Sequence, residues 1–494
     1  MNNSKHAMRG LAWACGIAAV MAVAGCGGGS SDDDNGGNPT TPTSPTAFVL
    51  DSIVLPGSKA QAQAETQVQP LGVTLRSTRI ALPQLDTTKS EQAGLGQPAM
   101  QIGVPRAVAQ TTSVAKTQAA LQWQPLPDGR TAAAVHIASE GAYGLRMGVL
   151  VDSLPDAAQL RIYSDEHPDA VVQVSGASVN ALLAQNRKAG EGGQAASTWW
   201  TPDVGAGNAT LEVVLPAGTA AEAVRIAIPS VSHIYQNLSL PTEAELADVT
   251  KAQQAGACNL DASCTSNYQL ERNAVARMVY VAADGISYLC TGTLVNNTKK
   301  DFTPYFLTAN HCISTQTSAS TLQTSWFYRS SSCNSGIPGT FASRNGGATL
   351  LYATASTDSS FLKLNDTPPA GVTLAGWDAR NTAKEGTAIY GLHHPMGDLL
   401  KYSVGAINGY TNCVSTGGIN VSCPAGDTQS NFYSVRWSQG VTQGGSSGSG
   451  LFSDGRVIGT LYGGSSACTA LNGTDNYGRF DKVFNSKIWS WLAG

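Results

Sequence analysis

The stretch Gly445-Ser446-Ser447-Gly448 decides how this chain is interpreted. A serine between glycines marks a tight turn that can approach a substrate carbonyl closely, because glycine tolerates backbone conformations that other residues avoid. The segments 433–437 and 457–462 on either side are apolar and strand-like. A flexible glycine- and serine-rich linker is the alternative, but such a linker is not expected between two strands. We therefore interpret Ser447 as a nucleophile.

Two earlier segments supply a histidine and an aspartate. His311 follows the apolar run 305–309, and Asp358 precedes the apolar run 361–364. Histidine, aspartate and serine in this chain order form one of the known arrangements of a nucleophilic triad. We expect His311 to act as the general base, Asp358 to orient it, and Ser447 to form an acyl-enzyme.

The same loop offers two backbone amides for an oxyanion hole. Gly445 and Ser447 are the expected donors, each contributing about 3 kcal/mol to the transition state. Asp366 and Asp378 are rivals of the proposed orienting aspartate, but each lies in a looser local context.

His393-His394-Pro395 raises the alternative of a metal site. Adjacent residues at the end of a strand point to opposite sides, so two such imidazoles seldom bind one ion together. We therefore expect a structural role for these histidines, and a mechanism that needs neither a metal nor another cofactor.

Length and composition set the broad class. The chain has 494 residues, which exceeds one ordinary domain. Apolar residues make up 42%, charged residues only 13%, and the net charge is −4. This composition, with many short strand-like runs, is typical of an exported all-β protein. Because no basic stripe is present, nucleic acid is not an expected partner.

The N-terminus is typical of a bacterial export signal. We assign residues 1–26 to it, because a basic start precedes an apolar run from 11 to 24 that is too short to span a membrane. The signal ends in Val23-Ala24-Gly25-Cys26, which resembles a lipobox with Cys26 as the lipid-anchored residue; an ordinary secretory signal is the alternative. Residues 27–47 are read as a flexible tether. The only expected contact with a membrane is this lipid anchor.

Cysteine usage also indicates export. Ten cysteines are present, and eight of them follow residue 257. An even number confined to one region of an exported protein predicts disulfides, and the lack of C-x-x-C spacing argues against a metal site. The eight are Cys258, Cys264, Cys290, Cys312, Cys333, Cys413, Cys423 and Cys468.

Two β-rich regions are expected. Residues 48–251 start with a weakly patterned stretch to about 115 and then contain regularly spaced strand-like runs, which predict a β-sandwich with one helix at 179–188. Residues 252–494 are again β-rich, with a predicted C-terminal helix at 481–492. The size of this second region suits two six-stranded antiparallel β-barrels with the active site in the cleft between them. The runs in the first region are 133–137, 144–150, 159–163, 170–174, 210–215 and 223–228.

From about Cys258 to Gly494, the chain resembles the trypsin-like (chymotrypsin-fold) serine peptidases, and most closely the bacterial lysyl endopeptidases. The resemblance rests on linked motifs at Gly256-Ala257-Cys258-Asn259, Cys290-Thr291-Gly292-Thr293-Leu294-Val295-Asn296-Asn297, 305–312, Ala375-Gly376-Trp377-Asp378, His393-His394-Pro395, 445–449 and Asp475-Asn476-Tyr477-Gly478-Arg479.

This resemblance implies cleavage after lysine. Asp475 would lie at the base of the specificity pocket and pair with the substrate ammonium. Gly463 and Gly464 would line that pocket, and Val441 occupies the position that trypsins use for the same purpose. Arginine or mixed basic specificity remains an alternative.

A tryptophan near the cleft is also implied by the resemblance. Trp377 matches it, and Tyr462 stands where the family has a histidine. We expect both to bind substrate and to stack on each other.

The resemblance further implies the disulfides Cys258–Cys468, Cys264–Cys333 and Cys290–Cys312, whereas Cys413–Cys423 is suggested only by proximity. It also implies a zymogen, in which the residues before 252 form a propeptide that is removed by cleavage after Lys251. Such a cut would free the protease from its lipid anchor.

We expect a monomer that acts on proteins and peptides. The alternative from another class is a surface adhesin whose protease domain is degenerate. In that case Trp123 and Trp199-Trp200 would form a binding face, although buried core is their commoner use.

Overall fold

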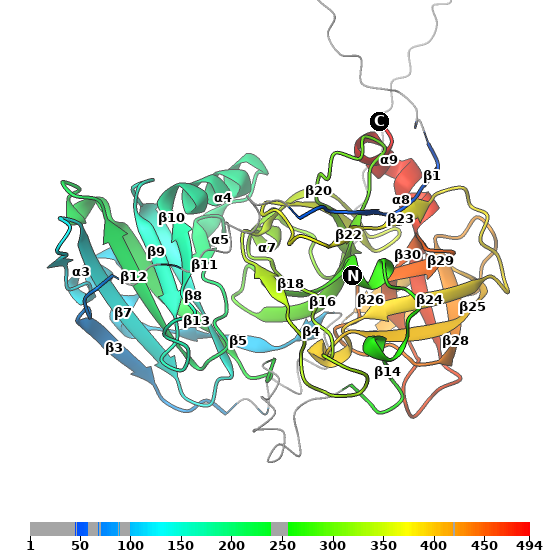
Figure 1. Ribbon diagram of the computed structural model, residues 1–494, viewed down its shortest axis with the longest axis horizontal. Helices are drawn as coiled ribbons and strands as arrows, with labels where there is room; N and C mark the ends of the chain where they lie inside the picture. The colour runs from blue at the N-terminus through cyan, green and yellow to red at the C-terminus, as the bar shows by residue number, and fades with distance from the viewer. Residues whose placement is uncertain are drawn as a thin grey trace, which may run out of the picture. The chain divides into compact units, whose positions relative to one another are not determined.

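The computed structural model describes residues 45, 47–57, 68, 71–86, 88, 99–238, 255–417 and 420–494 (Figure 1). The expected export signal, Cys26, most of the tether and Lys251 lie outside these residues. Within the described part of the chain, no helix combines the length and the apolar character required to cross a bilayer.

The first β-rich region is a sandwich of two sheets. One sheet has the order β10-β9-β12-β7-β3, with β6 also paired to β7, and the other has the order β11-β8-β13-β5. The first consists of β3 Ser77–Leu82, β6 Gln124–Pro125, β7 Thr131–Ser139, β9 Gln159–Tyr163, β10 Val172–Ser175 and β12 Asn208–Leu215. The second consists of β5 Gly103–Ala107, β8 Gly144–Ser153, β11 Thr198–Trp200 and β13 Arg225–Ile234.

A single apolar core joins the two sheets of the sandwich. Val135, Met147 and Leu211 from three different strands belong to it and are fully buried. Helix α4 Gly176–Lys188 starts where the Ser175 side chain accepts a hydrogen bond from the Ser178 amide, a typical N-cap. The predicted sandwich and helix are therefore confirmed, whereas helix α3 Val114–Ala120 was not predicted.

The C-terminal half contains a closed antiparallel barrel. Its strands follow the order β30-β29-β24-β25-β28-β31, and pairing between β30 and β31 closes the ring. These strands are β24 Ala388–His393, β25 Lys401–Thr411, β28 Phe432–Gln439, β29 Gly450–Ser453, β30 Arg456–Gly464 and β31 Thr474–Arg479. Its apolar core includes Ile407, Val435 and Leu461.

A second antiparallel sheet precedes this barrel in the chain. Its order is β19-β18-β15-β16-β17-β21-β20, and its core includes Met278, Phe306 and Leu362. The strands are β15 Val275–Val281, β16 Ser287–Val295, β17 Tyr305–Ala309, β18 Gln323–Trp326, β19 Ala342–Arg344, β20 Ala348–Thr354 and β21 Ser359–Leu364. The expectation of an all-β protease fold with a closed six-stranded barrel is thus confirmed, whereas the described strand pairs of this second sheet form a path of seven strands whose ends do not pair.

Three short strands from the N-terminal region join the sheets of the C-terminal half. Strand β1 Val49–Leu50 pairs with β23 Gly376–Asp378, and β2 Ile53–Val54 pairs with β22 Thr373–Leu374. Strand β4 Met100–Gln101 pairs with β16. The weakly patterned N-terminal stretch therefore gains part of its order from partners that are distant in sequence.

The chain ends in the predicted helical segment, and all four expected disulfides are present. The segment consists of α8 Phe480–Val483, the π-helical turn η6 Phe484–Ile488 and α9 Trp489–Leu492. The disulfides are Cys258–Cys468, Cys264–Cys333, Cys290–Cys312 and Cys413–Cys423.

Disulfides that close long loops restrict the unfolded chain most. Cys258 and Cys468 are separated by 210 residues, and Cys413 and Cys423 by 10. In a Ser447→Ala background, we expect replacing the first pair by serines to lower the free energy of unfolding by about 5 kcal/mol and replacing the second by about 3 kcal/mol. Urea denaturation followed by tryptophan fluorescence measures both; equal losses would contradict the loop-entropy argument.

Candidate active site

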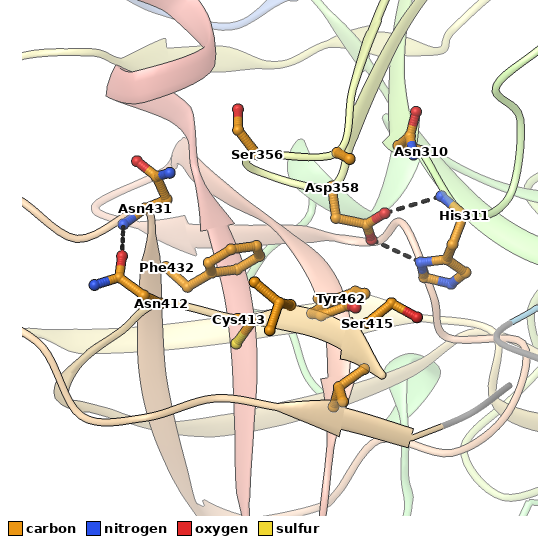
Figure 2. Close-up of a pocket in the computed structure, with 13 residues that line it drawn as sticks. Asn310, His311, Ser356, Asp358, Asn412, Cys413, Ser415, Asn431, Phe432 and Tyr462 are labelled. Atoms are coloured by element: carbon orange, nitrogen blue, oxygen red, sulfur yellow. Dashed lines mark hydrogen bonds and ion pairs between the residues drawn. The ribbon is translucent and has the colours of Figure 1, made fainter. Parts of the chain in front are cut away.

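His311 and Asp358 form a buried, doubly connected pair. Strand β17 ends two residues before His311, and strand β21 begins immediately after Asp358. Asp358 Oδ1 accepts the backbone amide of His311 at 2.9 Å, and Oδ2 lies 2.6 Å from His311 Nδ1 (Figure 2). Two adjacent antiparallel strands therefore fix the imidazole through both its backbone and its ring.

The Asp358 contact determines which ring nitrogen of His311 carries the proton. An ionised carboxylate only accepts hydrogen bonds, so Nδ1 is the donor. Nε2 then presents its lone pair. This atom is buried and has no hydrogen-bond partner in the described part of the chain. It is the atom that a general base needs to keep available.

Residues 445–448, called the nucleophile loop below, pack directly against strands β16 and β17, and His311 follows the second of these strands. The carbonyl of Ser447 accepts the Thr291 amide of β16 at 2.8 Å. At Gly448, where φ is +84°, a Cβ would lie 2.2 Å from Thr308 Oγ1 and 2.7 Å from the Ala309 nitrogen. Only glycine allows this approach, which brings the closed barrel's loop against β17.

The backbone of the loop leaves two amides unused. Among the described residues, neither Gly445 nor Ser447 donates its amide to another group, whereas the Ser446 amide donates to the Gln443 carbonyl and the Gly448 amide to the Leu461 carbonyl. Gly445 has φ +88°, and its carbonyl accepts the Thr291 hydroxyl at 2.8 Å. Free amides on alternate residues suit the predicted oxyanion hole.

His393 is hydrogen-bonded to the nucleophile loop, and His394 is buried beside it. His393 Nδ1 lies 2.9 Å from Ser446 Oγ, and His394 Nδ1 lies 2.9 Å from the Asp398 carbonyl oxygen. Burial lowers the pKa of each imidazole to about 3, so both are neutral at ordinary pH. This is a structural role, as the sequence predicted.

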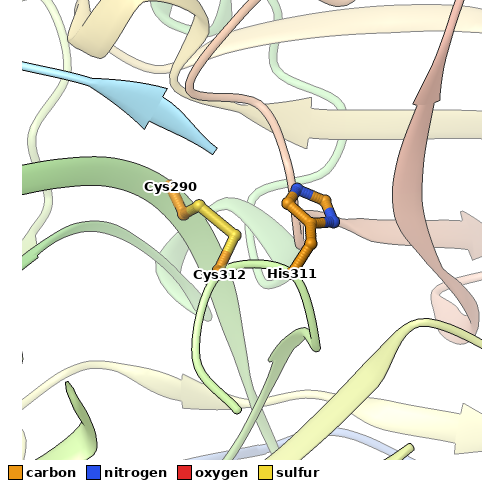
Figure 3. A group of neighbouring side chains, drawn as sticks. All are labelled: Cys290, His311 and Cys312. Carbon is orange, nitrogen blue, oxygen red and sulfur yellow. A yellow bond between two sulfur atoms is a disulfide. The ribbon is translucent and has the colours of Figure 1, made fainter. Parts of the chain in front are cut away.

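One described cluster has the residue types of a metal site but not the chemistry. The sulfur atoms of Cys290 and Cys312 lie within 4.8 Å of a His311 ring nitrogen. The two cysteines are joined in a disulfide (Figure 3), so neither sulfur is the thiolate that binds a metal ion. The disulfide instead ties the loop that carries His311 to β16.

Asp475 is a buried carboxylate with an uneven set of hydrogen bonds. Its Oδ2 accepts hydrogen bonds from Trp437 Nε1, Thr442 Oγ1 and Ser466 Oγ at 2.7, 2.8 and 2.6 Å. Among the described residues, its Oδ1 accepts only the Ser466 amide, at 3.3 Å. A Cβ on Gly464 would lie 2.5 Å from that Oδ1, so the absence of a side chain at position 464 lets the backbone pass close to the carboxylate.

Comparison with known proteins identifies the family. The model of the lysyl endopeptidase C-terminal domain matches residues 252–478, and the model of the lysyl endopeptidase N-terminal domain matches residues 73–235. A lysyl endopeptidase from Pseudomonas aeruginosa is 35% identical over 393 residues, which cover 76% of this chain and 78% of the relative. The chain belongs to the lysyl endopeptidase family. It is a serine endopeptidase that acts on proteins or peptides.

Other comparisons are more distant. The secreted RxLR effector protein 73 of Plasmopara viticola is 30% identical over 238 residues, which cover 45% of this chain and 54% of that protein. The apo MamO protease domain from Magnetospirillum magneticum is 12% identical, with a TM-score of 0.30 over 44% of this chain and 97% of that domain. The crystal structure of Deg5 is 14% identical, with a TM-score of 0.31 over 46% and 94%.

The predicted placement of Trp377 at the substrate cleft is wrong. Its side chain is fully buried, 5.0 Å from the ring of Phe484, and donates Nε1–H to the Asn296 carbonyl. The C-terminal helical segment therefore covers it. The aromatic neighbours of Tyr462 are His311 at 5.8 Å and Phe432 at 5.5 Å between ring centroids. Phe432, not Trp377, packs against Tyr462, with its ring tilted by 33°.

Several residues at the site were not predicted. Thr442, Trp437 and Ser466 hold Asp475, and Phe432 supports Tyr462. Only Thr442 had a signal in the sequence. It directly follows Val441, which occupies the position that trypsins use to select basic side chains. The other three are brought to the site by strand pairing and a loop.

Replacing Asp358 by asparagine tests the tautomer argument. An amide at this position can donate to Nδ1 and so favour the imidazole form that is protonated on Nε2. We expect kcat to fall by about 10⁴-fold with little change in KM. Kinetics on a chromogenic lysyl ester, with Asp454→Asn on an exposed turn as the matched control, measure the effect. A loss below tenfold would show that Asp358 does not orient the base.

Proposed function

We propose that this protein is an exported serine endopeptidase that cleaves peptide bonds on the C-terminal side of lysine. The observation that carries the proposal is the buried Asp475 carboxylate beside Gly464, which has three donors on Oδ2 and, among the described residues, one long contact on Oδ1; we infer that the slot for the lysine side chain ends there. A buried carboxylate selects a cation. Family membership supports the same specificity.

The proposed reaction uses three side chains and two amides. Ser447 Oγ attacks the carbonyl carbon of the lysine residue, and His311 Nε2 takes the hydroxyl proton. Asp358 stabilises the imidazolium that forms, while the amides of Gly445 and Ser447 donate to the developing oxyanion. The imidazolium then returns the proton to the leaving amine. Water attacks the acyl-enzyme in the same way and releases the product acid.

Lysine fits the slot better than arginine on chemical grounds. Three donors already occupy Asp475 Oδ2, so the carboxylate cannot offer both oxygens to a guanidinium fork. An ammonium needs only a point contact at Oδ1. Strict preference for lysine follows from this asymmetry, and mixed basic specificity is the alternative outcome of the test.

Asp475→Asn should remove the specificity. Loss of a buried charge partner costs about 2–5 kcal/mol, so kcat/KM for lysyl peptides should fall by about 30-fold to 4,000-fold. Activity on a peptide with norleucine in place of lysine should not fall. Steady-state kinetics on matched lysyl, arginyl and norleucyl peptides measure this, with Asp454→Asn as the control. Equal rates on lysyl and arginyl peptides for the unaltered protein would refute strict lysine specificity.

We further propose that residues 48–251 act as a propeptide and that Cys26 carries a lipid anchor until processing. The contact of β4 with β16 supports the first point, since it places Met100 beside Gly444, which directly precedes the nucleophile loop. Arg146 of the sandwich also donates to the Thr321 carbonyl at 2.8 Å. A cut after Lys251, which lies outside the described residues, would separate these parts.

Self-processing makes a clear prediction. Ser447→Ala should accumulate as the uncut chain, whereas added active enzyme should cut it after Lys251. Lys251→Gln in the otherwise unaltered chain should block that cut. Intact-mass spectrometry follows both. Normal processing of Ser447→Ala in a pure preparation would rule out self-cleavage.

The contacts of the three tryptophans do not favour the adhesin alternative. Trp199 is buried in the sandwich core. Trp123 and Trp200 are half-buried, Trp123 against the same core and Trp200 next to Gly148.

A further inference from the structure

A small disulfide-closed hairpin beside the catalytic pair has no part in the mechanism. Strands β26 Val414–Gly417 and β27 Asn420–Ser422 pair with each other, with Val414 opposite Ser422. The Cys413–Cys423 disulfide closes the hairpin at its base. A two-stranded hairpin is marginally stable alone, and this disulfide joins the outer ends of the two strands.

The hairpin forms one wall of the catalytic cavity. A cavity of about 440 Å³ is lined by Val414, Ser415 and Val421 from the hairpin, and by Phe432 and Tyr462 from the closed barrel (Figure 2). Asn412 and Asn431 lie on the barrel side of the same cavity, and His311 and Asp358 lie on its far side. An occupant of this cavity would therefore contact both the hairpin and the catalytic pair.

The hairpin wall is apolar and exposed. Val414 is 59% exposed and Val421 is 37% exposed, although both border a cavity. Apolar side chains left open to solvent around a concave site are typical of a binding surface. The only charged group among the described lining residues, Asp358, is already paired with His311. The cavity therefore suits an uncharged, apolar side chain.

The position of the cavity tells which part of a substrate would enter it. Tyr462 lies on β30, and the next two residues, Gly463 and Gly464, lead along that strand to Asp475. A substrate that places lysine in the slot would extend along β30 as an added strand. The Cys290–Cys312 disulfide lies on the opposite side of His311. The residues after the lysine, which form the leaving group, would lie on that side. The residues before the lysine therefore face the cavity.

We propose that the 413–423 hairpin, with Phe432 and Tyr462, forms an apolar subsite that selects substrates with a large apolar residue within three positions before the lysine. This inference rests on the proposed cleavage after lysine. It adds a second requirement to that cleavage. Asp475 binds the lysine side chain, and the disulfide-closed hairpin binds an apolar side chain that precedes it in the substrate.

The test is a positional scan of peptide substrates with lysine fixed. Leucine, phenylalanine, glycine and aspartate are placed in turn at each of the three positions before lysine and the two after it. We expect leucine or phenylalanine to raise kcat/KM at least tenfold over glycine or aspartate at one or more positions before lysine, with smaller differences after it.

Two variants and a control locate the source of the preference. Val414→Ser with Val421→Ser should reduce the apolar preference by about fivefold to tenfold, while kcat/KM on the glycine peptides stays the same. Cys413→Ser with Cys423→Ser should change the preference in the same direction. Leu270→Ser, which alters a 47% exposed apolar side chain outside the cavity lining, should change nothing.

The outcomes separate this inference from the proposed function. Cleavage after lysine with no apolar preference before it, or with a preference unchanged in the hairpin variants, would overturn the subsite and leave the lysine specificity standing. An equal loss on all peptides would also overturn it, since the hairpin would then only support the catalytic pair. Failure to cut after lysine in any peptide would overturn the proposed function itself.

Discussion

The active site depends on one close backbone approach. Gly448 sits against Thr308, Ala309 and the carbonyl of Thr291, in a space that has no room for a Cβ. The nucleophile loop comes from the closed barrel, whereas His311 and Asp358 come from the other sheet. Their alignment therefore relies on this packed contact and on the Thr291 hydrogen bonds to Ser447 and Gly445. Rigid contacts of this kind preorganise catalytic groups without a moving part.

Two buried carboxylates, Asp358 and Asp475, have opposite arrangements of hydrogen-bond partners. Asp358 has its charge directed at one imidazole and its second oxygen held by a backbone amide. Asp475 has three donors on one oxygen and little on the other. The first arrangement completes a charge pair inside the protein. The second leaves one carboxylate oxygen with little hydrogen bonding, which is the arrangement that the proposed binding of a lysine ammonium requires.

Sequence patterns predicted the parts of the site that depend on short motifs. The glycines around Ser447 and the strand that leads to His311 have local signatures, as have most strands of the sandwich. Trp377 was misplaced because its environment comes from the C-terminal helical segment, a hundred residues away, which covers it completely. The contact of Phe432 with Tyr462 likewise comes from packing across the barrel. Such contacts have no local signal, and so could not have been predicted.

The short N-terminal strands change what a single cut can achieve. Strands β1 and β2 pair with β23 and β22, Asn296 donates to the Asp51 carbonyl, and Arg456 pairs with the Asp51 carboxylate. Each of these contacts joins a residue before position 251 to one after it, and none is covalent. Cutting the bond after residue 251 would leave two chains held by a noncovalent complex whose separation obeys mass action. Release of the enzyme would then depend on its concentration. The cleaved chains would stay associated at high concentration and separate on dilution.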